Sequence, residues 1–505
     1  MTGGNHVIAS FEISRDRNIR KCSAAGMSSP SHLTIFAFIW ACQALVHQDF
    51  YSSWLRENDP RGWMLTVLAV GTLLRPSSLP LFSGMLLSSI VYNVAKWPFV
   101  VNHILLETII NATILGAIIG TLLGRRESCR LDDKFRMEVF QRFSPVIWIM
   151  LVIMYWFAFL AKLNTDFINP DFSCVVSMYG DVLRRFPFLP NNPATHNAAI
   201  VMTLVIEALI PLCLSFRRTR WIAVLIGLPF HLVLGLVGHR TFSAFAYALY
   251  VLLCMNGIRP FIEFCSQWIE QRISEKSRRI GYSVVATTVV AVVTLLIVFE
   301  LSGKSRSKIV GVGIYQVHWL IWIAWSVLVI AVCAAGMLWH RFRRGSYTVA
   351  TAGSPRPGLL WCTLPLVVLI GLSQYIGLKT ETCFTMFSNL RTEGNWNNHL
   401  FMPAFKLGPW QKDLVTIVST NHPELQKYIE HNDLITFFEL RRIVSATSCA
   451  TPFHLNYERS GEPQYLAYSD NQLTQTEQWG RHSKLLGKLL YFRPVPTGNC
   501  VPCRH

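Results

Sequence analysis

The sequence predicts an all-α polytopic membrane bundle of about 11 transmembrane helices, followed by a small C-terminal α+β domain outside the membrane. Three observations lead to this fold class. Apolar residues make up 51% of the 505-residue chain and charged residues only 15%, whereas ordinary soluble domains carry about 25% charged residues. Long apolar runs recur through the first three quarters of the chain, and the last quarter is polar. The Lys and Arg residues between the runs gather on one side of the predicted membrane.

A helix needs about 20 mostly apolar residues to span a bilayer. The stretches that approach this length and composition are 33–47, 62–75, 78–95, 102–123, 145–163, 197–216, 220–237, 241–257, 281–301, 315–339 and 359–376. They divide the chain into a polar N-terminal segment (1–31), which we expect to be disordered, a first membrane domain (32–300), additional transmembrane helices (301–379) and the C-terminal domain (380–505).

The charges of the connecting segments predict the orientation. With the N-terminus inside, the inner segments carry 23 Lys and Arg residues and the outer ones carry 9. Because positively charged loops stay in the cytoplasm, this bias favours a cytoplasmic N-terminus. The number of spans is odd, so the C-terminal domain is expected in the periplasm, in a lumen or outside the cell. The net charge of +17 therefore reflects topology, and nucleic-acid binding is not expected.

The C-terminal domain contains short apolar runs with strand character. They are Leu414–Val418, Leu434–Phe438, Phe453–Tyr457 and Leu489–Phe492, with a hairpin turn near 457–465. Residues 423–431 resemble a short helix. The aromatic and polar stretch 384–399 follows the last span, where it is expected either to cover an outward cavity or to form a packed collar.

The cysteines of this domain offer three interpretations. The candidates are Cys383, Cys449, Cys500 and Cys503. Disulfides among them are favoured in an exported domain, with free thiols as the alternative. A metal site is not predicted, because the C-x-x-C at 500–503 has no second pair of ligands.

Ionisable residues inside spans are costly and mark functional sites by default. His103 and Glu107 lie one helical turn apart on the fourth span, in a stripe that continues to Asn111. The alternative is a His–Glu pair that only joins two helices. Lys162 lies near the outer end of the fifth span, where it either reaches the headgroups or serves as a desolvated base.

Two further ionisable residues, Glu207 and His231, have no charged partner nearby in sequence. If buried, each needs a partner from another helix. Counting 1.5 Å per helical residue puts the ionisable residues of these four spans in the outer half of the bilayer. The sequence therefore predicts one cavity that opens outward, beneath the C-terminal domain.

These same residues carry a family resemblance over about residues 30–300. The segment Tyr155–Asp166, YWFAFLAKLNTD, resembles the "Y-(F/L)-x-A-G-x-x-K-L" segment of the vitamin K-dependent γ-carboxylase membrane domain, within the horizontally transferred transmembrane (HTTM) family. Phe230-His231 looks like that family's "F-H" helix, and 242–247 looks like the aromatic helix that follows it. Glu207 before Pro211, together with 217–220, resembles the step "E-x-x-x-P-x-L…R-T-R". The pair 102–103 looks like the family's "N-H".

The resemblance implies an enzyme with Lys162 as the base that deprotonates a reduced, vitamin K-like quinone and His103 as its helper. In those carboxylases oxygenation then produces a strong base, which takes a proton from a substrate glutamate before CO2 adds. This chain departs from them, because Ala161 replaces the first residue of a lysine doublet and Leu232 replaces an Asn. Its C-terminal region is also shorter.

Two other functions fit the same sequence. One is a membrane scaffold without enzymatic activity that binds a lipid or quinone, with the bilayer and a hydrophobic small molecule as its partners. The other is a transporter, although the chain lacks the paired halves with matching broken helices that many transporters have.

Overall fold

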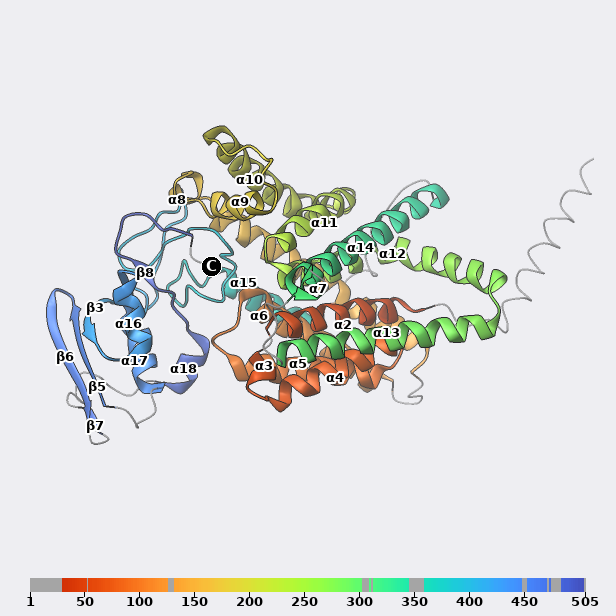
Figure 1. Ribbon diagram of the computed structural model, residues 1–505, viewed down its shortest axis with the longest axis horizontal. Coiled ribbons are helices and arrows are strands. Elements are labelled where there is room, and N and C mark those ends of the chain that lie inside the picture. The colour runs from red at the N-terminus through yellow and green to blue at the C-terminus, as the bar shows by residue number, and fades with distance from the viewer. Residues whose placement is uncertain are drawn as a thin grey trace, which may run out of the picture.

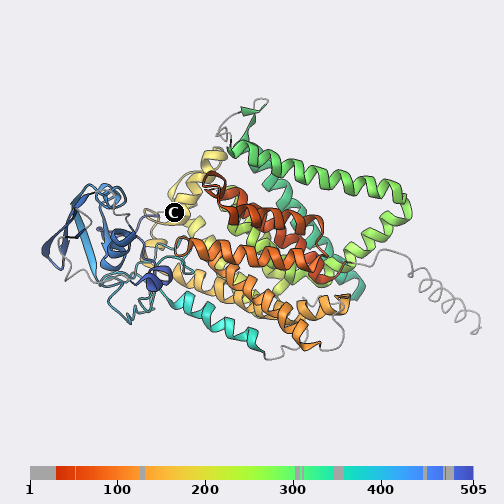
Figure 2. The same cartoon turned by 90° about the horizontal axis from the view of Figure 1, so that it is seen from below.

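The computed structural model describes residues 30–51, 53–125, 131–301, 308–309, 312–344, 358–446, 452–469, 472–473 and 483–503. Helices form an elongated bundle, and a small domain with a β-sheet lies at one end of it (Figures 1 and 2). The predicted polar N-terminal segment lies outside the described residues, except for its last two positions.

Helices occupy all eleven of the predicted segments. Their bounds are α2 His32–Phe50, α4 Pro60–Leu74, α5 Leu79–Lys96, α6 Asn102–Gly124, α7 Asp133–Ala161, α10 Pro193–Ser215, α11 Arg220–Leu236, α12 Arg240–Arg272, α13 Glu275–Leu301, α14 Ile314–Arg344 and α15 Thr363–Leu372, which follows a 3-10 turn. Three short helices lie between them, namely α3 Ser53–Arg56, α8 Thr165–Ile168 and α9 Cys174–Arg185.

Seven of these helices, α2, α6, α7, α10, α12, α13 and α14, are long and apolar enough to cross a membrane. The chain is thus built as a multi-pass integral membrane protein. The number of eleven spans is not confirmed, because α4, α11 and α15 are shorter apolar helices and α5 is not among the seven. Neither the length nor the composition of the helices fixes which end of the chain is cytoplasmic.

Helix α12 is the centre of the bundle, with α2, α11 and α14 packed around it. Its side chains Phe245, Tyr247 and Tyr250 are fully buried. By contrast, α13 lies along the outside and exposes an apolar surface that includes Val285 and Leu295. Several helices begin at residues whose side chains cap the first turn. Asn192, for example, forms a capping box ahead of α10, which satisfies amide groups that the first helical turn leaves unpaired.

The C-terminal domain contains a six-stranded antiparallel sheet in the order β7-β6-β5-β3-β4-β8. The strands are β3 Leu414–Thr420, β4 Asp433–Thr436, β5 Phe453–Arg459, β6 Glu462–Ser469, β7 Gln472–Leu473 and β8 Val495–Pro496, and the helices are α16 Pro423–Glu430, α17 Phe437–Ala446 and α18 Lys484–Leu489. An additional two-stranded sheet, β1 Lys308–Ile309 with β2 Val312–Gly313, lies elsewhere in the chain.

Most of the predicted features of this domain are present. The hairpin turn falls at Ser460–Gly461 between β5 and β6, and the short helix is α16. The predicted strand Leu489–Phe492 is wrong, because α18 ends there and the following residues are irregular. Leu490 and Phe492 are instead buried against Phe438, so their apolar character reflects packing rather than strand formation.

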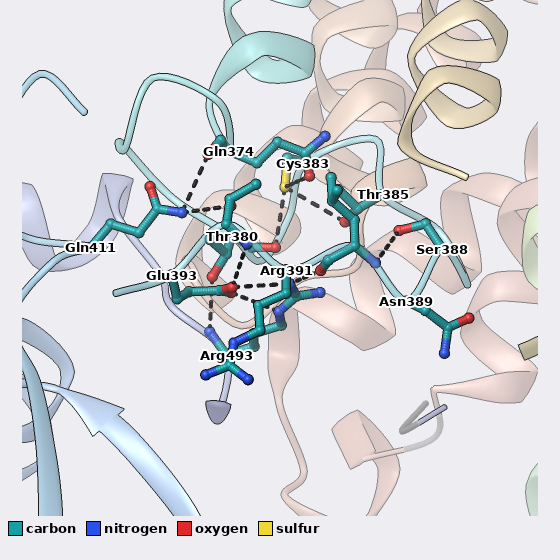
Figure 3. Close-up of polar contacts among 12 residues, drawn as sticks. Gln374, Thr380, Cys383, Thr385, Ser388, Asn389, Arg391, Glu393, Gln411 and Arg493 are labelled. Atoms are coloured by element: carbon teal, nitrogen blue, oxygen red, sulfur yellow. Dashed lines mark hydrogen bonds and ion pairs between the residues drawn. The ribbon is translucent and has the colours of Figure 1, made fainter. Parts of the chain in front are cut away.

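An irregular segment, residues 373–411, connects the bundle to this domain. It is called the collar segment below. Its buried Glu393 forms an ion pair with Arg493 at 2.7 Å (Figure 3). Burial alone would raise the pKa of the Glu393 carboxyl, but the charge and hydrogen bonds of Arg493 outweigh burial and lower that pKa. Gln411 donates to the carbonyl oxygen of Gln374 and to the hydroxyl of Thr392. These bonds hold the collar segment in one conformation above the helices.

Candidate functional site

A cavity of about 360 Å³ lies among five helices, α7, α9, α10, α11 and α12, and the collar segment. Nearly all of its wall is apolar. The lining residues come from α7 (Tyr155, Ala158), the residue after α7 (Lys162), α9 (Val175, Met178, Tyr179, Val182), α10 (Ala199, Met202, Thr203, Ile206, Glu207), α11 (Ile226, Pro229, Phe230, Val233, Leu234), its C-terminal end and α12 (Val237, His239, Phe242), and the collar segment (Met386, Phe387).

Lys162 and Glu207 meet in the wall of this cavity. The Nζ atom of Lys162 lies 2.8 Å from Oε2 of Glu207, and both side chains are largely buried. Lys162 Nζ also donates to the carbonyl oxygens of Met386, at 2.8 Å, and of Ala158, at 3.3 Å. Lys162 Nζ thus has two hydrogen-bond acceptors and one ion-pair partner. Lys162 does not reach outward to the headgroups, and Glu207 has obtained the partner that its burial requires.

A hydrogen-bonded tyrosine–histidine cluster lies beside this pair. Tyr155 Oη is 2.6 Å from Nε2 of His231, and the hydroxyl of Tyr250 donates to Tyr155 at 3.0 Å. Tyr155 lines the cavity, whereas the ring of His231 is fully buried behind it. The predicted partner for His231 from another helix is therefore a tyrosine rather than a charged group.

The cavity opens toward the lipid-facing surface of the bundle. Met202 of α10 and Val233 of α11 line the cavity and are also 60% and 50% exposed. In a membrane protein such apolar exposed side chains face hydrocarbon. A ligand that dissolves in the bilayer can therefore reach the cavity from the side, between these two helices.

The collar segment forms the wall opposite the helices. Met386 and Phe387 line the cavity, and the Phe387 ring packs against His239 with centroids 4.2 Å apart. The side-chain amide of Asn102 donates to the Cys383 carbonyl at 2.8 Å. That of Asn164 donates to the carbonyl oxygen of Ser388. Two hydrogen bonds thus join the bundle to the expected stretch 384–399, one just before its first residue and one within it. This stretch both covers the cavity and packs as a collar.

His103 and Glu107 lie elsewhere. Glu107 Oε2 is 2.8 Å from Nδ1 of His47 and accepts a hydrogen bond from Gln43, while Ser89 donates to its other oxygen. Glu107 faces a second pocket, of about 680 Å³, whose lining includes His47, Ser89 and Lys96 together with apolar residues. The His103 ring packs among aromatic rings, with no hydrogen-bond partner at Nε2 among the described residues.

The five ionisable residues therefore divide between two places rather than lining one cavity. Lys162, Glu207 and, through Tyr155, His231 belong to the first. Glu107 belongs to the second, and Asn111 continues the stripe by accepting from the Trp40 indole and donating to Ser89. His103 lines neither pocket, but its ring packs against His47, which lines the second. A depth count along each helix could not separate the two groups, because it carries no information about the direction that a side chain takes around the bundle.

The disulfide prediction requires a correction. Cys503 is bonded to Cys174, at the start of α9, a residue outside the four candidates. Cys383 and Cys500 are free thiols, and Cys449 lies outside the described residues. Among the described residues no group of three or more His, Cys, Asp or Glu side chains could hold a metal ion.

Sequence reasoning also missed helix α9 and the role of Tyr155. Residues 164–196 lie between two of the predicted spans and were assigned no helix, because α9 is amphipathic and too short to span a membrane. Its alternation of apolar and polar residues at helical spacing was the available signal. Comparison of the chain with protein-family models, with curated proteins and with solved structures finds no match.

Proposed function

We propose that this protein is an HTTM-like membrane enzyme that binds a hydrophobic, quinone-like molecule in its reduced form and catalyses a γ-carboxylase-like reaction. One observation carries the proposal. The buried Lys162–Glu207 pair forms the polar end of a cavity whose other walls are almost entirely apolar. Five residues of the family resemblance line this cavity, namely Tyr155, Lys162, Glu207, Phe230 and Phe242, whereas His103 does not.

The shape and chemistry of the cavity fit a reduced quinone. Its volume of about 360 Å³ lies within the range of small-molecule sites, which are mostly apolar with a few placed polar groups. Phe230 and Phe242 offer aromatic faces for a ring. Lys162 and Glu207 offer a donor and an acceptor for a hydroxyl group. The lateral opening at Met202 and Val233 suits a ligand that arrives through the bilayer.

Lys162 can serve as the base through its pairing with Glu207. A desolvated site disfavours a single unpaired charge, so two forms of the pair are allowed. One is an ammonium with a carboxylate, and the other, after transfer of one proton, is an amine with a carboxylic acid. In the second form Lys162 Nζ accepts a proton from a ligand hydroxyl. The resulting ammonium group then lies next to the negatively charged oxygen of the deprotonated ligand. A reduced quinone, when bound, supplies the oxygen-dependent chemistry of the carboxylases.

The activity test uses the full-length chain in lipid nanodiscs, supplied with reduced vitamin K, oxygen and bicarbonate. We expect epoxide formation by the wild type and none by Lys162→Ala. The matched control is Lys96→Ala, which removes a partly buried lysine that contacts Tyr92 and Ser53 in the second pocket. Epoxide formation by folded Lys162→Ala at the wild-type rate would exclude Lys162 as the base.

A second candidate function is a ligand-binding scaffold without turnover. It is favoured by the contacts that Lys162 Nζ already makes with Glu207, Met386 and Ala158, because a ligand that binds to Nζ must compete with these partners. In this case the purified wild type retains a hydrophobic ligand, which mass spectrometry of an organic extract detects, but forms no epoxide beside an active carboxylase control.

The proposed topology has eleven spans, a cytoplasmic N-terminus and an exported C-terminal domain. It rests on the excess of Lys and Arg in the alternate connecting segments. Single cysteines placed in the segments 126–130 and 345–357 of a cysteine-depleted chain test it. We expect both to resist a membrane-impermeant maleimide in sealed spheroplasts or intact cells and to react after lysis. Labelling before lysis would contradict this orientation.

A further inference from the structure

Tyr155 is the one residue that belongs both to the cavity wall and to the tyrosine–histidine cluster. Its hydroxyl oxygen lies 2.6 Å from Nε2 of His231, and the hydroxyl of Tyr250 donates to it at 3.0 Å. All three rings are buried in the bundle. Tyr155 shares the cavity wall with Lys162 and Glu207.

The surroundings of His231 determine the direction of the hydrogen bond with Tyr155. The Nδ1 atom of this fully buried ring has no hydrogen-bond partner among the described residues. Buried N–H groups without an acceptor are rarer in proteins than acceptors that lack a donor. The favoured tautomer therefore leaves Nδ1 unprotonated and carries its proton on Nε2. His231 then donates to Tyr155, so that the Tyr155 oxygen accepts two hydrogen bonds and its own proton is free to point into the cavity.

We infer that Tyr155 donates a hydrogen bond to the oxygen of the bound ring and stabilises that oxygen once Lys162 has taken its proton. The inference rests on the proposed function, since it concerns the same ligand. His231 and Tyr250 are positioning residues that act through Tyr155. Each hydrogen bond received by the Tyr155 oxygen polarises its O–H bond, and a fixed donor in a dry site favours the charged form of its partner.

Close packing keeps Tyr250 in place. Gly227 of α11 lies against its hydroxyl, and a Cβ atom at position 227 would be only 2.1 Å from Tyr250 Oη. Such a contact forces the tyrosine to move. Gly227→Ala is therefore expected to reproduce Tyr250→Phe, because both variants remove one of the two hydrogen bonds that Tyr155 receives.

A matched pair of probes tests the inference. The first is 2-hydroxy-1,4-naphthoquinone, which is an anion at neutral pH, and the second is its uncharged methyl ether. Binding to the full-length protein in nanodiscs is measured by calorimetry. Tyr155→Phe is expected to weaken binding of the anion about 10-fold or more, as hydrogen bonds to charged groups imply, and to leave binding of the ether unchanged.

The control is Tyr247→Phe. Tyr247 is buried on α12 like Tyr250, but it does not line the cavity, and its hydroxyl donates to the carbonyl oxygen of Leu228 at 3.3 Å. Loss of this hydroxyl should change the affinity for neither probe. A second readout is the visible absorbance of the bound hydroxyl probe as pH varies. The wild type should favour the ionised form, and Tyr155→Phe and Tyr250→Phe should both move its ionisation toward that of the free probe.

The outcomes separate the inference from the proposed function. If Tyr155→Phe weakens both probes equally, Tyr155 only packs against the ligand and the inference is overturned while the proposed function stands. If neither probe binds to the wild type, the ligand site itself is refuted and the inference fails with it. Should Tyr155→Phe not fold, Tyr250→Phe decides, because selective weakening of the anion supports the inference and equal affinity for the two probes contradicts it.

Discussion

Lys162 and Glu207 form an ion pair, at 2.8 Å, between the end of α7 and the middle of α10. The same lysine binds the carbonyl oxygen of Met386 in the collar segment. One side chain thus joins two membrane helices to the segment that carries the C-terminal domain. The pair has a structural role in addition to the proposed chemical one, and the two roles can be separated by experiment.

The structural role predicts unequal effects of single and double substitutions. Removing one member of a buried ion pair leaves an uncompensated charge, which costs about 3–5 kcal/mol. We expect Lys162→Met or Glu207→Gln to lower the free energy of unfolding by about 3 kcal/mol, measured by denaturant titration in detergent. Lys162→Met combined with Glu207→Leu should recover most of this loss. A double variant that is less stable than either single one would contradict the pairing.

The lateral opening between α10 and α11 predicts that a bulky side chain placed there slows the entry of a ligand. Met202→Trp is expected to slow association of a naphthoquinone probe several-fold, because the new ring fills the opening between α10 and α11. Val201→Trp is the control, since Val201 lies on the same helix and is 59% exposed, close to the 60% of Met202, but does not line the cavity. Equal association rates of these two variants, measured by stopped-flow fluorescence, would argue against this route.

Lys379, which lies outside the predicted spans, makes the free energy of unfolding depend on pH. Burial lowers its pKa from 10.5 to about 8, although its ammonium donates to Thr382 at 2.9 Å. Between these two values the unfolded chain binds more protons than the folded one, so stability rises with pH. We expect a gain of about 3 kcal/mol from pH 8 to pH 10.5, from the two pKa values.

The control for this dependence is Lys379→Met, which removes the titrating group. Its free energy of unfolding should exceed that of the wild type at pH 7 and change less across the same range. If the wild type loses stability as the pH rises through this range and the variant follows it unchanged, Lys379 is not the group responsible.

The disulfide predicts that the effects of its two Cys→Ser substitutions on Tm do not add. The bond joins Cys174, at the start of α9, to Cys503, so either Cys→Ser substitution breaks it. We expect Cys174→Ser and Cys503→Ser to lower Tm by the same amount, and the double variant to lower it no further. Alkylation before reduction should label Cys500 in the wild type, because this thiol is free and partly exposed. A larger loss of Tm in the double variant would refute the pairing.

The positions of the helices could be predicted from the sequence because apolar runs report them directly. Composition also identified the residues that are costly to bury, and Lys162 and Glu207 proved to be partners. Their pairing was not predictable, since it depends on the rotation of α7 and α10 about their axes. The separation of His103 from Lys162 has the same cause, because depth along a helix does not determine the direction that a side chain takes around its axis.

Other features left weaker signals in the sequence. The pairing of Cys174 with Cys503 joins residues 329 positions apart, and such a pairing cannot be deduced from spacing. Tyr155 stood within a recognised motif, but its importance depends on contacts with His231 and Tyr250 from two other helices. Its role therefore became visible only once those helices were placed.

The central claim is that a quinone-like ring occupies the cavity beside Lys162 and Glu207. The most direct measurement is photo-crosslinking of the full-length protein with a naphthoquinone that carries a diazirine on its side chain, followed by peptide mapping. We predict labelling of α9, α10 and α11 that an excess of unmodified naphthoquinone suppresses. Labelling confined to α2 and α5 around the second pocket, or labelling that competition does not reduce, would contradict the claim.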